Sequence, residues 1–155
     1  MTTAFTATAD KIGWYVEQAA DGTGDIVALL FKSGGETDGA LTDRATLSAV
    51  KSNNTECDFT NYSAGGKVCA APARAVDATG DRVTLSVESP IVWSNAGGTS
   101  NNNVGRIIYC YRPASGSTNA QILPLMATDI SATTNGNDLQ VSLHADGFAV
   151  VSAHS

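Results

Sequence analysis

A chain of 155 residues with 43% hydrophobic residues is long enough for one domain with a single buried core. Its formal net charge of −6, without any cluster of Lys and Arg, argues against binding to nucleic-acid phosphates or to an anionic membrane surface. Charged residues make up only 15% of the chain, so Ser, Thr, Asn and Gly must supply most of the polar surface, as is common in β-proteins with many turns.

The first segment, residues 1–9, is small and rich in Thr and Ala, and we expect a flexible arm there. It lacks a basic stretch followed by an apolar run, so no secretory signal is expected. The longest apolar run, Ile26–Phe31, is too short to cross a bilayer. We therefore expect a protein that is made in a cytosol, or that leaves it as part of something larger, and that does not bind membranes.

The residues after Asp10 predict a helix over about 11–20, with Asp10 as its N-cap. Asp21-Gly22 ends this helix. Trp14 lies off its apolar face, so the Trp14 side chain either contacts a partner or covers the rim of the core. The apolar face repeats at i, i+3, i+4 and i+7 and consists of Ile12, Tyr15, Val16 and Ala19.

The apolar run Asp25–Phe31, flanked by glycines, favours a strand buried on both faces, with a short buried helix as the alternative. A second helix is expected over 43–52, capped by Thr42 or Asp43, with Leu47 and Val50 facing inward. Residues 10–54 thus form a helix, strand and helix part.

Residues 55–155 predict a β-rich core of short strands separated by Gly, Asn and Asp turns. The fold class is therefore mainly β, an antiparallel β-sandwich or barrel-like core with one or two short N-terminal helices, in a single domain over 1–155. The loop Ser94–Asn103 is the most flexible-looking segment, and Asp146-Gly147 is a hairpin signal. The expected strands lie at 57–62, 68–76, 82–88, 90–93, 104–111, 121–128, 139–145 and 148–151.

The strand over 104–111 is apolar on both faces and is expected in the middle of a sheet. Its predicted faces are Val104, Ile108 and Cys110 on one side, and Ile107, Tyr109 and Tyr111 on the other.

Catalytic motifs are not evident. His144 and His154 are expected to face solvent, and the segment Asp77–Asp81 predicts a structural turn rather than a calcium loop. There is no GxSxG elbow and no HExxH. We expect no catalytic, cofactor or metal site and no enzyme activity. Carboxylates that could pair in a glycosidase, but that mostly lie at turns or strand ends, are Glu56, Asp58, Asp77, Asp81, Asp129 and Asp138.

The three cysteines, Cys57, Cys69 and Cys110, are widely spaced and odd in number, which is not typical of a disulfide framework. With only two histidines in the chain, a zinc site of the usual spacing cannot be assembled. We expect small buried hydrophobic side chains, with one disulfide left open as an alternative.

The aromatic residues Trp14, Tyr62 and Trp93 are the candidate contact residues, because aromatic side chains are enriched at protein interfaces. Ordinary use in the core is the interpretation that we favour for aromatic residues in general.

The order of several segments resembles a group of small tailed-bacteriophage virion proteins. The resemblance covers about residues 25–148 and lies in the following stretches: Asp25–Lys32, Asp43–Val50, Glu56-Cys-Asp-Phe-Thr-Asn-Tyr62, Pro90–Trp93, Gly105–Tyr111, Leu123-Pro-Leu125 and Asp129–Leu139.

This resemblance implies a non-enzymatic structural protein, plausibly a capsid decoration or minor capsid protein. Its implied partners are the major capsid protein and further copies of itself in a symmetric assembly, with no nucleic acid. Its implied place is the capsid surface of a virion assembled in the bacterial cytoplasm. One alternative is a tail- or fibre-associated module that binds the host surface through Trp93, Tyr62 and the polar loops. Another is a hydrolase of cell-wall sugars.

The stretch Thr42–Tyr62 is interpreted as a structural hinge between the helical N-terminal part and the β-core. Glu56 is expected to satisfy backbone or Arg donors there, and Phe59 to anchor the helix to the sheet.

Overall fold

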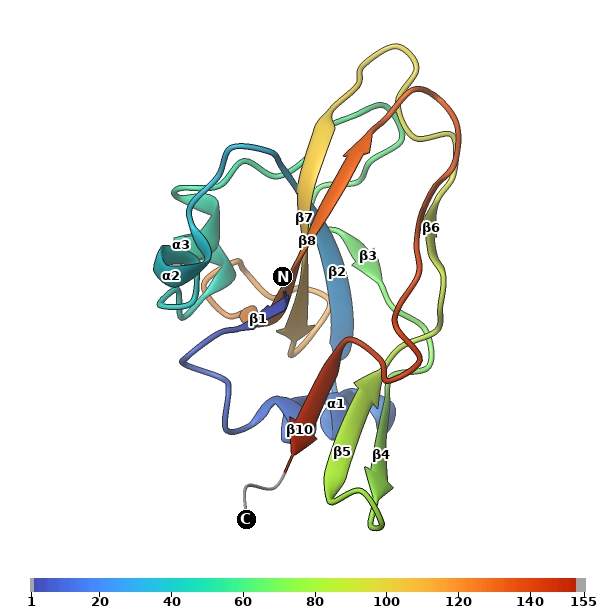
Figure 1. The fold of residues 1–155 in the computed structure, drawn as a ribbon. Helices are drawn as coiled ribbons and strands as arrows, with labels where there is room; N and C mark the ends of the chain where they lie inside the picture. The colour runs from blue at the N-terminus through green and yellow to red at the C-terminus, as the bar shows by residue number, and fades with distance from the viewer. Residues whose placement is uncertain (1, 153–155) are drawn as a thin grey trace.

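A five-stranded antiparallel sheet runs through the middle of the protein in the computed structural model, which describes residues 2–152 (Figure 1). Two smaller antiparallel sheets and three short helices lie around it. The protein is therefore mainly β with a sandwich-like core, as predicted. The strands of the large sheet, in spatial order, are β1 (Thr2–Ala4), β8 (Leu123–Thr133), β7 (Asn103–Arg112), β2 (Asp25–Lys32) and β3 (Lys67–Val68).

The central strands β2 and β7 are buried on both faces of this sheet, which explains their nearly continuous apolar sequences. In β2, the side chains of Ile26, Ala28 and Leu30 enter one apolar cluster and those of Val27, Leu29 and Phe31 the other. The prediction of a buried strand rather than a helix is confirmed.

In β7, the predicted orientation of the Val104 side chain is wrong. This residue packs on the same side as Ile107 and Tyr109, and not with Ile108. The cause is a shift in pairing between Val104 and Arg106, opposite Phe31 and Lys32, because an irregularity of this kind reverses the alternation of side chains beyond it.

Helices α2 (Asp38–Leu41) and α3 (Leu47–Lys51) cover one face of the large sheet (Figure 1). The helix expected over 43–52 begins only at Leu47. Thr46 is its N-cap, because the Thr46 hydroxyl oxygen accepts a hydrogen bond from the Ala49 N–H at 3.2 Å. Leu47 and Val50 face inward, as predicted.

Helix α1 (Ile12–Ala20) and the two smaller sheets cover the other face. Lys11 rather than Asp10 occupies the N-cap position of α1, and no side chain caps the helix there. The three-stranded sheet has the order β10 (Ala149–Ser152), β5 (Arg82–Ser86) and β4 (Ala73–Asp77), and the two-stranded sheet pairs β6 (Ile91–Trp93) with β9 (Leu139–Val141).

The hairpin of β4 and β5 is confirmed, although the strand expected over 68–76 is divided. Its first part, β3, pairs with β2, and its second part, β4, belongs to another sheet. The break lies at Ala71, which has a φ of 50°, and at Pro72, which cannot donate a backbone hydrogen bond.

Asp146-Gly147 lies in a tight turn, with an antiparallel bridge between His144 and Gly147, but the expected hairpin does not extend from it, because the strands on its two sides enter different sheets. The strand expected over 139–145 forms regular pairing only in β9, with β6. The Phe148 N–H donates to the Leu85 carbonyl oxygen at 2.9 Å, which leads the chain into pairing with β5 instead.

Residues 2–8 are not the flexible arm that we expected, because they are held against the large sheet. Strand β1 pairs with β8, and the Phe5 ring is buried in the core. The Thr8 hydroxyl donates to the Pro124 carbonyl oxygen at 2.7 Å. The apolar Phe5 and the ladder of β1 thus fix a segment whose small residues give little signal in the sequence.

The stretch Thr42–Tyr62 passes from one face of the large sheet to the other around the edge of β2. Leu47 belongs to one apolar cluster and Phe59 to the other. Between them, the Lys32 N–H donates to the Thr55 carbonyl oxygen at 2.8 Å, and the Cys57 N–H donates to the Leu30 carbonyl oxygen at 2.9 Å. The strand expected over 57–62 does not form, because only this short contact pairs with the sheet.

Candidate contact surfaces

The three aromatic side chains predicted to make contacts lie in different environments. Trp93 is only 6% exposed and packs in the core, so its ring is not available to a partner. The pairing of β6 with β9 turns Trp93 and Ile91 toward the interior together. Trp14 is 53% exposed, which makes it the one of the three that presents most of its ring to solvent.

Tyr62 is half-buried and has a structural role. Its ring packs on Phe59 with the ring centroids 5.1 Å apart. Its hydroxyl accepts the Leu30 N–H at 3.1 Å and donates to the Glu56 carboxylate at 2.9 Å. Burial and the neighbouring Glu56 charge raise the pKa of the Tyr62 phenol far above its ordinary value.

Glu56 is the centre of a hydrogen-bonded network that the sequence indicated only in outline. Its side chain is 8% exposed, and its oxygens accept from the Lys51 ammonium at 2.6 Å and from the Gly65 N–H at 2.8 Å, besides Tyr62. The expectation of backbone donors is confirmed, whereas the cation is Lys51 and not an arginine. This carboxylate stabilises the edge of the sheet.

Four of the other carboxylates that could have formed a glycosidase pair are engaged by hydrogen-bond donors or cations. Asp58 binds the Lys32 ammonium at 2.7 Å, and this bond, followed by that from the Asn102 amide, lowers the Asp58 pKa. Asp77 accepts the backbone N–H groups of Thr79 and Gly80, so the segment after it is the predicted turn. Asp129 binds Arg106 at 3.1 Å, and Asp138 accepts the Asn95 N–H at 2.8 Å.

The histidines and cysteines likewise form no constellation. The His144 side chain is 78% exposed, as predicted, and His154 lies outside the described residues. Cys57, Cys69 and Cys110 are free and buried, which confirms their interpretation as small hydrophobic side chains. Within residues 2–152, no group of His, Cys, Asp and Glu could hold a metal ion, and no helix is long and apolar enough to span a membrane.

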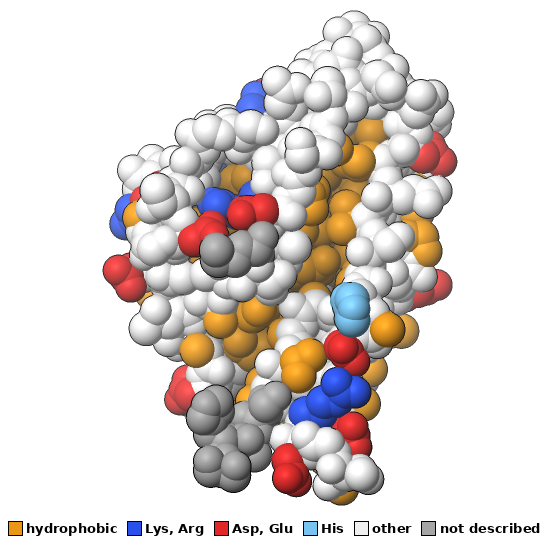
Figure 2. All heavy atoms as spheres, in the orientation of Figure 1, with side chains coloured by type: hydrophobic (Ala, Val, Ile, Leu, Met, Phe, Trp, Pro, Cys, Tyr) orange, Lys and Arg blue, Asp and Glu red, His pale blue; other side chains and the backbone are white. Residues whose placement is uncertain are grey.

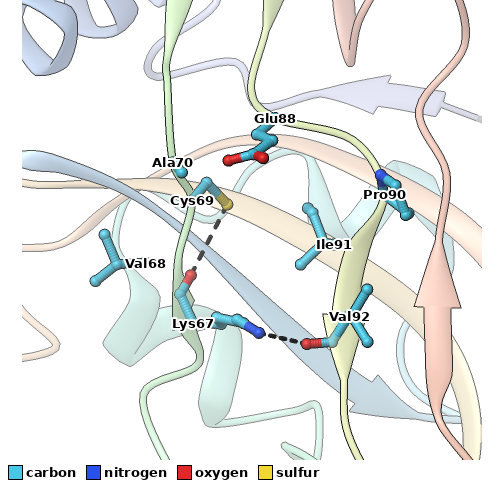
Figure 3. A pocket seen from close by; sticks show the side chains of 8 residues that line it. All are labelled: Lys67, Val68, Cys69, Ala70, Glu88, Pro90, Ile91 and Val92. Atoms are coloured by element: carbon cyan, nitrogen blue, oxygen red, sulfur yellow. Dashed lines mark hydrogen bonds between the residues drawn. The ribbon is translucent and has the colours of Figure 1, made fainter.

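A hollow of about 260 Å³ lies between the segment Lys67–Ala70 and the segment Pro90–Val92 (Figure 3). The Lys67 ammonium donates to the Val92 carbonyl oxygen and so links the two walls. The Cys69 thiol lies 3.8 Å from the Lys67 carbonyl oxygen, and burial raises its pKa to about 12. Because a protonated thiol is a poor nucleophile, we do not expect Cys69 to act as a nucleophile in this hollow.

The Trp14 surface is the most exposed apolar region among the described residues. Two hollows flank the Trp14 ring. One, of about 340 Å³, lies between α1 and the three-stranded sheet, and the other, of about 440 Å³, lies along the start of α1. Val76 and Val151 are exposed on the same side of the three-stranded sheet, because Val76 and Val151 both pair with Val83, which lines the first hollow. We define the Trp14 surface as Asp10, Lys11, Trp14, Glu17, Arg74, Val76 and Val151.

Unpaired charges also collect on the Trp14 surface. Within residues 2–152, Lys11 and Arg74 are the two cations whose charged groups have neither an ion pair nor a hydrogen bond. Elsewhere the charged groups of Lys and Arg pair with carboxylates, or bind a carbonyl oxygen, as Lys67 does. Arg74 lies across Gly13 of α1, where a Cβ atom would be 3.5 Å from its Nε.

An apolar strip is also visible in Figure 2, along the opening between the large sheet and the two-stranded sheet. Apolar side chains of β8 and β9 that pack against the core, among them Ile130, Leu139 and Val141, are half-buried. They are covered more than Trp14 or Val76, so the strip is the side of the sandwich and not a protruding surface.

A second candidate surface, the polar end, consists of residues 58–61, 94–102 and 134–138, which meet at one end of the molecule (Figure 1). The loop expected to be the most flexible is hydrogen-bonded to both other segments. The Asn102 N–H donates to the Thr134 hydroxyl at 2.8 Å, and the Ser100 N–H donates to the Thr60 hydroxyl at 3.0 Å. The Gly97 N–H donates to the Thr60 carbonyl oxygen at 2.9 Å.

No protein-family model, curated protein or solved structure matches the chain in comparisons with known proteins. The resemblance to small virion proteins therefore stays a prediction from the sequence, and the two surfaces are the structural features on which a function can be argued.

Proposed function

We propose that the chain is a structural subunit of a tailed-phage particle that attaches to the capsid surface by binding the major capsid protein through its polar end. Two observations support this proposal. Residues 25–148 resemble small virion proteins in the order of their motifs. The polar end is a surface of amides, hydroxyls and backbone groups in fixed positions, and this second observation carries the argument.

Fixed groups favour binding because little conformational entropy is lost when a partner orders them. In the polar end, the Asn102 amide donates to Asp58 at 3.0 Å and the Asn101 side chain accepts the Gly98 N–H at 2.8 Å. These bonds hold the loop before any partner arrives.

The charges of the polar end are also compatible with a protein contact. Its two carboxylates are already engaged, Asp58 with Lys32 and Asp138 with the Asn95 N–H. Covering this end with a partner therefore leaves no carboxylate without a hydrogen-bond donor, which would be the most costly outcome of burial.

The test is co-sedimentation of the purified chain with shells that are assembled from the major capsid protein of the same phage and that lack the chain. Thr99 is exposed at the polar end and its side chain makes no hydrogen bond within the described residues, so Thr99→Trp adds bulk there without removing one. We expect this variant to bind at least about tenfold more weakly, as for a loss of about 1.4 kcal/mol.

Ser115→Trp is the matched control, since Ser115 is also exposed but lies beyond the other end of β7. It should bind as the unmodified chain does. Failure of the unmodified chain to co-sediment would overturn the capsid placement. Binding to host cells without binding to shells would instead favour a tail- or fibre-associated module.

A further inference from the structure

Helix α1 and its N-cap residue Lys11 present an exposed stripe with opposite charges on the two sides of Trp14. Lys11, Trp14 and Glu17 are exposed, while Ile12, Val16 and Ala19 of the same segment are buried. Lys11 precedes Trp14 by three residues and Glu17 follows it by three. Residues three apart are neighbours on a helix surface, so the aromatic ring has a cation on one side and a carboxylate on the other.

A two-fold axis that passes beside Trp14, perpendicular to α1, would make this stripe complementary to itself. Two antiparallel α1 helices related by such an axis place Lys11 of each copy opposite Glu17 of the other. The side chains of Lys11 and Glu17 have no partner within the described residues, so these ion pairs would form without breaking existing ones.

The apolar part of the Trp14 surface fits the same arrangement. Each Trp14 ring protrudes between two hollows, of about 340 and 440 Å³. Two rings related by the axis can each enter a hollow beside the other. Val151 lines the first hollow. Val76, which is 63% exposed, lies on the same face of the three-stranded sheet, because Val76 and Val151 both pair with Val83, and it adds apolar area.

The net charge of the chain bears on which kind of molecule can bind the Trp14 surface. Copies of a chain with a net charge of −6 repel one another over most of their surface. The Trp14 surface carries two cations, Lys11 and Arg74, and two carboxylates, Asp10 and Glu17, so its formal charges cancel. A neutral surface with charges of both signs suits a second copy better than a strongly acidic or strongly basic partner.

We propose that the Trp14 surface is the contact of a two-fold symmetric dimer of this chain, in which two α1 helices pack antiparallel about Trp14 with reciprocal Lys11–Glu17 ion pairs. The inference does not rest on the proposed function, because it concerns two copies in solution. The polar end lies at the opposite end of the molecule from α1 and β4, so the dimer leaves it free (Figure 1).

The test is sedimentation velocity of the isolated chain over a range of concentrations, which gives the dissociation constant of the dimer. Lys11→Glu places two carboxylates opposite each other, and Glu17→Lys does the same with two cations. Each variant should raise the dissociation constant at least tenfold. The double variant, Lys11→Glu with Glu17→Lys, restores opposite charges and should return it to within about threefold of the original.

Glu88→Lys is the matched control. Glu88 is exposed, and its carboxylate has no partner in the described chain. The variant has the same net charge as Glu17→Lys but should dimerise as the unmodified chain does. Circular dichroism of every variant checks that the fold is kept.

Two results would overturn the dimer: an unmodified chain that stays monomeric up to millimolar concentration, or a double variant as weak as the single ones. Thr99→Trp, which tests the capsid contact, should leave the dissociation constant unchanged. A failure of the capsid proposal and a failure of the dimer are therefore seen in separate measurements.

Discussion

At the scale of single residues, Glu56 and Tyr62 close the edge of the five-stranded sheet where regular pairing with β2 ends. The Glu56 carboxylate is buried and accepts three hydrogen bonds, one of them from Tyr62. The Tyr62 hydroxyl also accepts the Leu30 N–H of β2. A buried carboxylate is tolerated only when its partners are complete, so each member of this network matters to stability.

Tyr62→Phe tests this network. The change leaves the Leu30 N–H without its acceptor and Glu56 without one donor, so we expect a loss of about 1–3 kcal/mol in the free energy of unfolding. Urea denaturation measures it. Tyr15→Phe is the control, because the Tyr15 ring packs on Tyr111 while its hydroxyl makes no hydrogen bond in the described chain. Equal losses in both variants would contradict the role given to the Tyr62 hydroxyl.

The three buried cysteines make a second prediction at this scale. Burial raises the pKa of Cys57 and Cys69 to about 12 and that of Cys110 further still. Because the thiolate is the reactive form, the folded protein should resist a thiol-specific chromogenic reagent near neutral pH. The same assay in denaturant should titrate all three thiols. Rapid labelling of the folded protein would show that these side chains are not enclosed as described.

At the scale of elements, the sequence predicted correctly those helices and strands whose formation depends on residues close together in the chain. The apolar run of β2 and the alternation of β5, with Asp77 in the turn before it, led to the right structures. Pairing between distant segments was not predictable in this way. Asp146-Gly147 has the composition of a hairpin turn, yet the Leu85 carbonyl oxygen, 63 residues before Phe148, decides where the chain goes next.

Gly147→Ala tests that connection. Gly147 has a φ of +83°, and a Cβ atom there would lie 2.1 Å from the Leu85 carbonyl oxygen. The backbone of β5 cannot move far enough to relieve this clash, because it is paired on both sides. We expect a loss of more than about 1 kcal/mol in the free energy of unfolding. Gly116→Ala is the control, since a Cβ atom at Gly116 meets nothing within 4 Å. A Gly147→Ala variant as stable as this control would contradict the close approach of Gly147 to Leu85 where the chain passes from β9 to β10.

The segment that leads into α2 gives a prediction on pH. Hydrogen bonds from Arg44, and then from Asn54, lower the pKa of Glu36 from its ordinary value of 4.5. The ionised Glu36 carboxylate therefore stabilises the folded state fully above pH 4.5. This contribution to the free energy of unfolding is lost as the pH falls below 4.5 toward the pKa of Glu36 in the folded state. Thermal unfolding should show a deficit for Glu36→Gln that is largest near neutral pH and shrinks in acid. A deficit that does not change with pH would exclude this carboxylate as its source.

At the scale of the whole molecule, the protein has two distinct ends. One carries the hydrogen-bonded polar loops and the other carries α1 with the exposed Trp14 (Figure 1). Under the two proposals, the polar end of this acidic chain binds the capsid lattice and the other end binds a second copy of the chain. The proposed dimer would also use the Trp14 surface, on which the unpaired cations Lys11 and Arg74 lie.

The sequence predicted part of these surfaces. Trp14 could be recognised because it lies off the apolar face of its helix, whereas Trp93 could not be placed, because a strand of three residues does not show which of its faces is buried. The rigidity of the polar end depends on bonds such as that between Asn102 and Thr134, which are 32 residues apart. Asn and Gly in the sequence indicate a loop but not its hydrogen-bonding partners.

The most direct test of the proposed capsid placement is a cryo-electron microscopy reconstruction of the intact phage particle at a resolution that resolves strands. We expect density for this fold on the outer capsid surface, with residues 58–61, 94–102 and 134–138 against the major capsid protein. Density for the chain in the tail, or on the capsid with the polar end turned toward solvent, would contradict it.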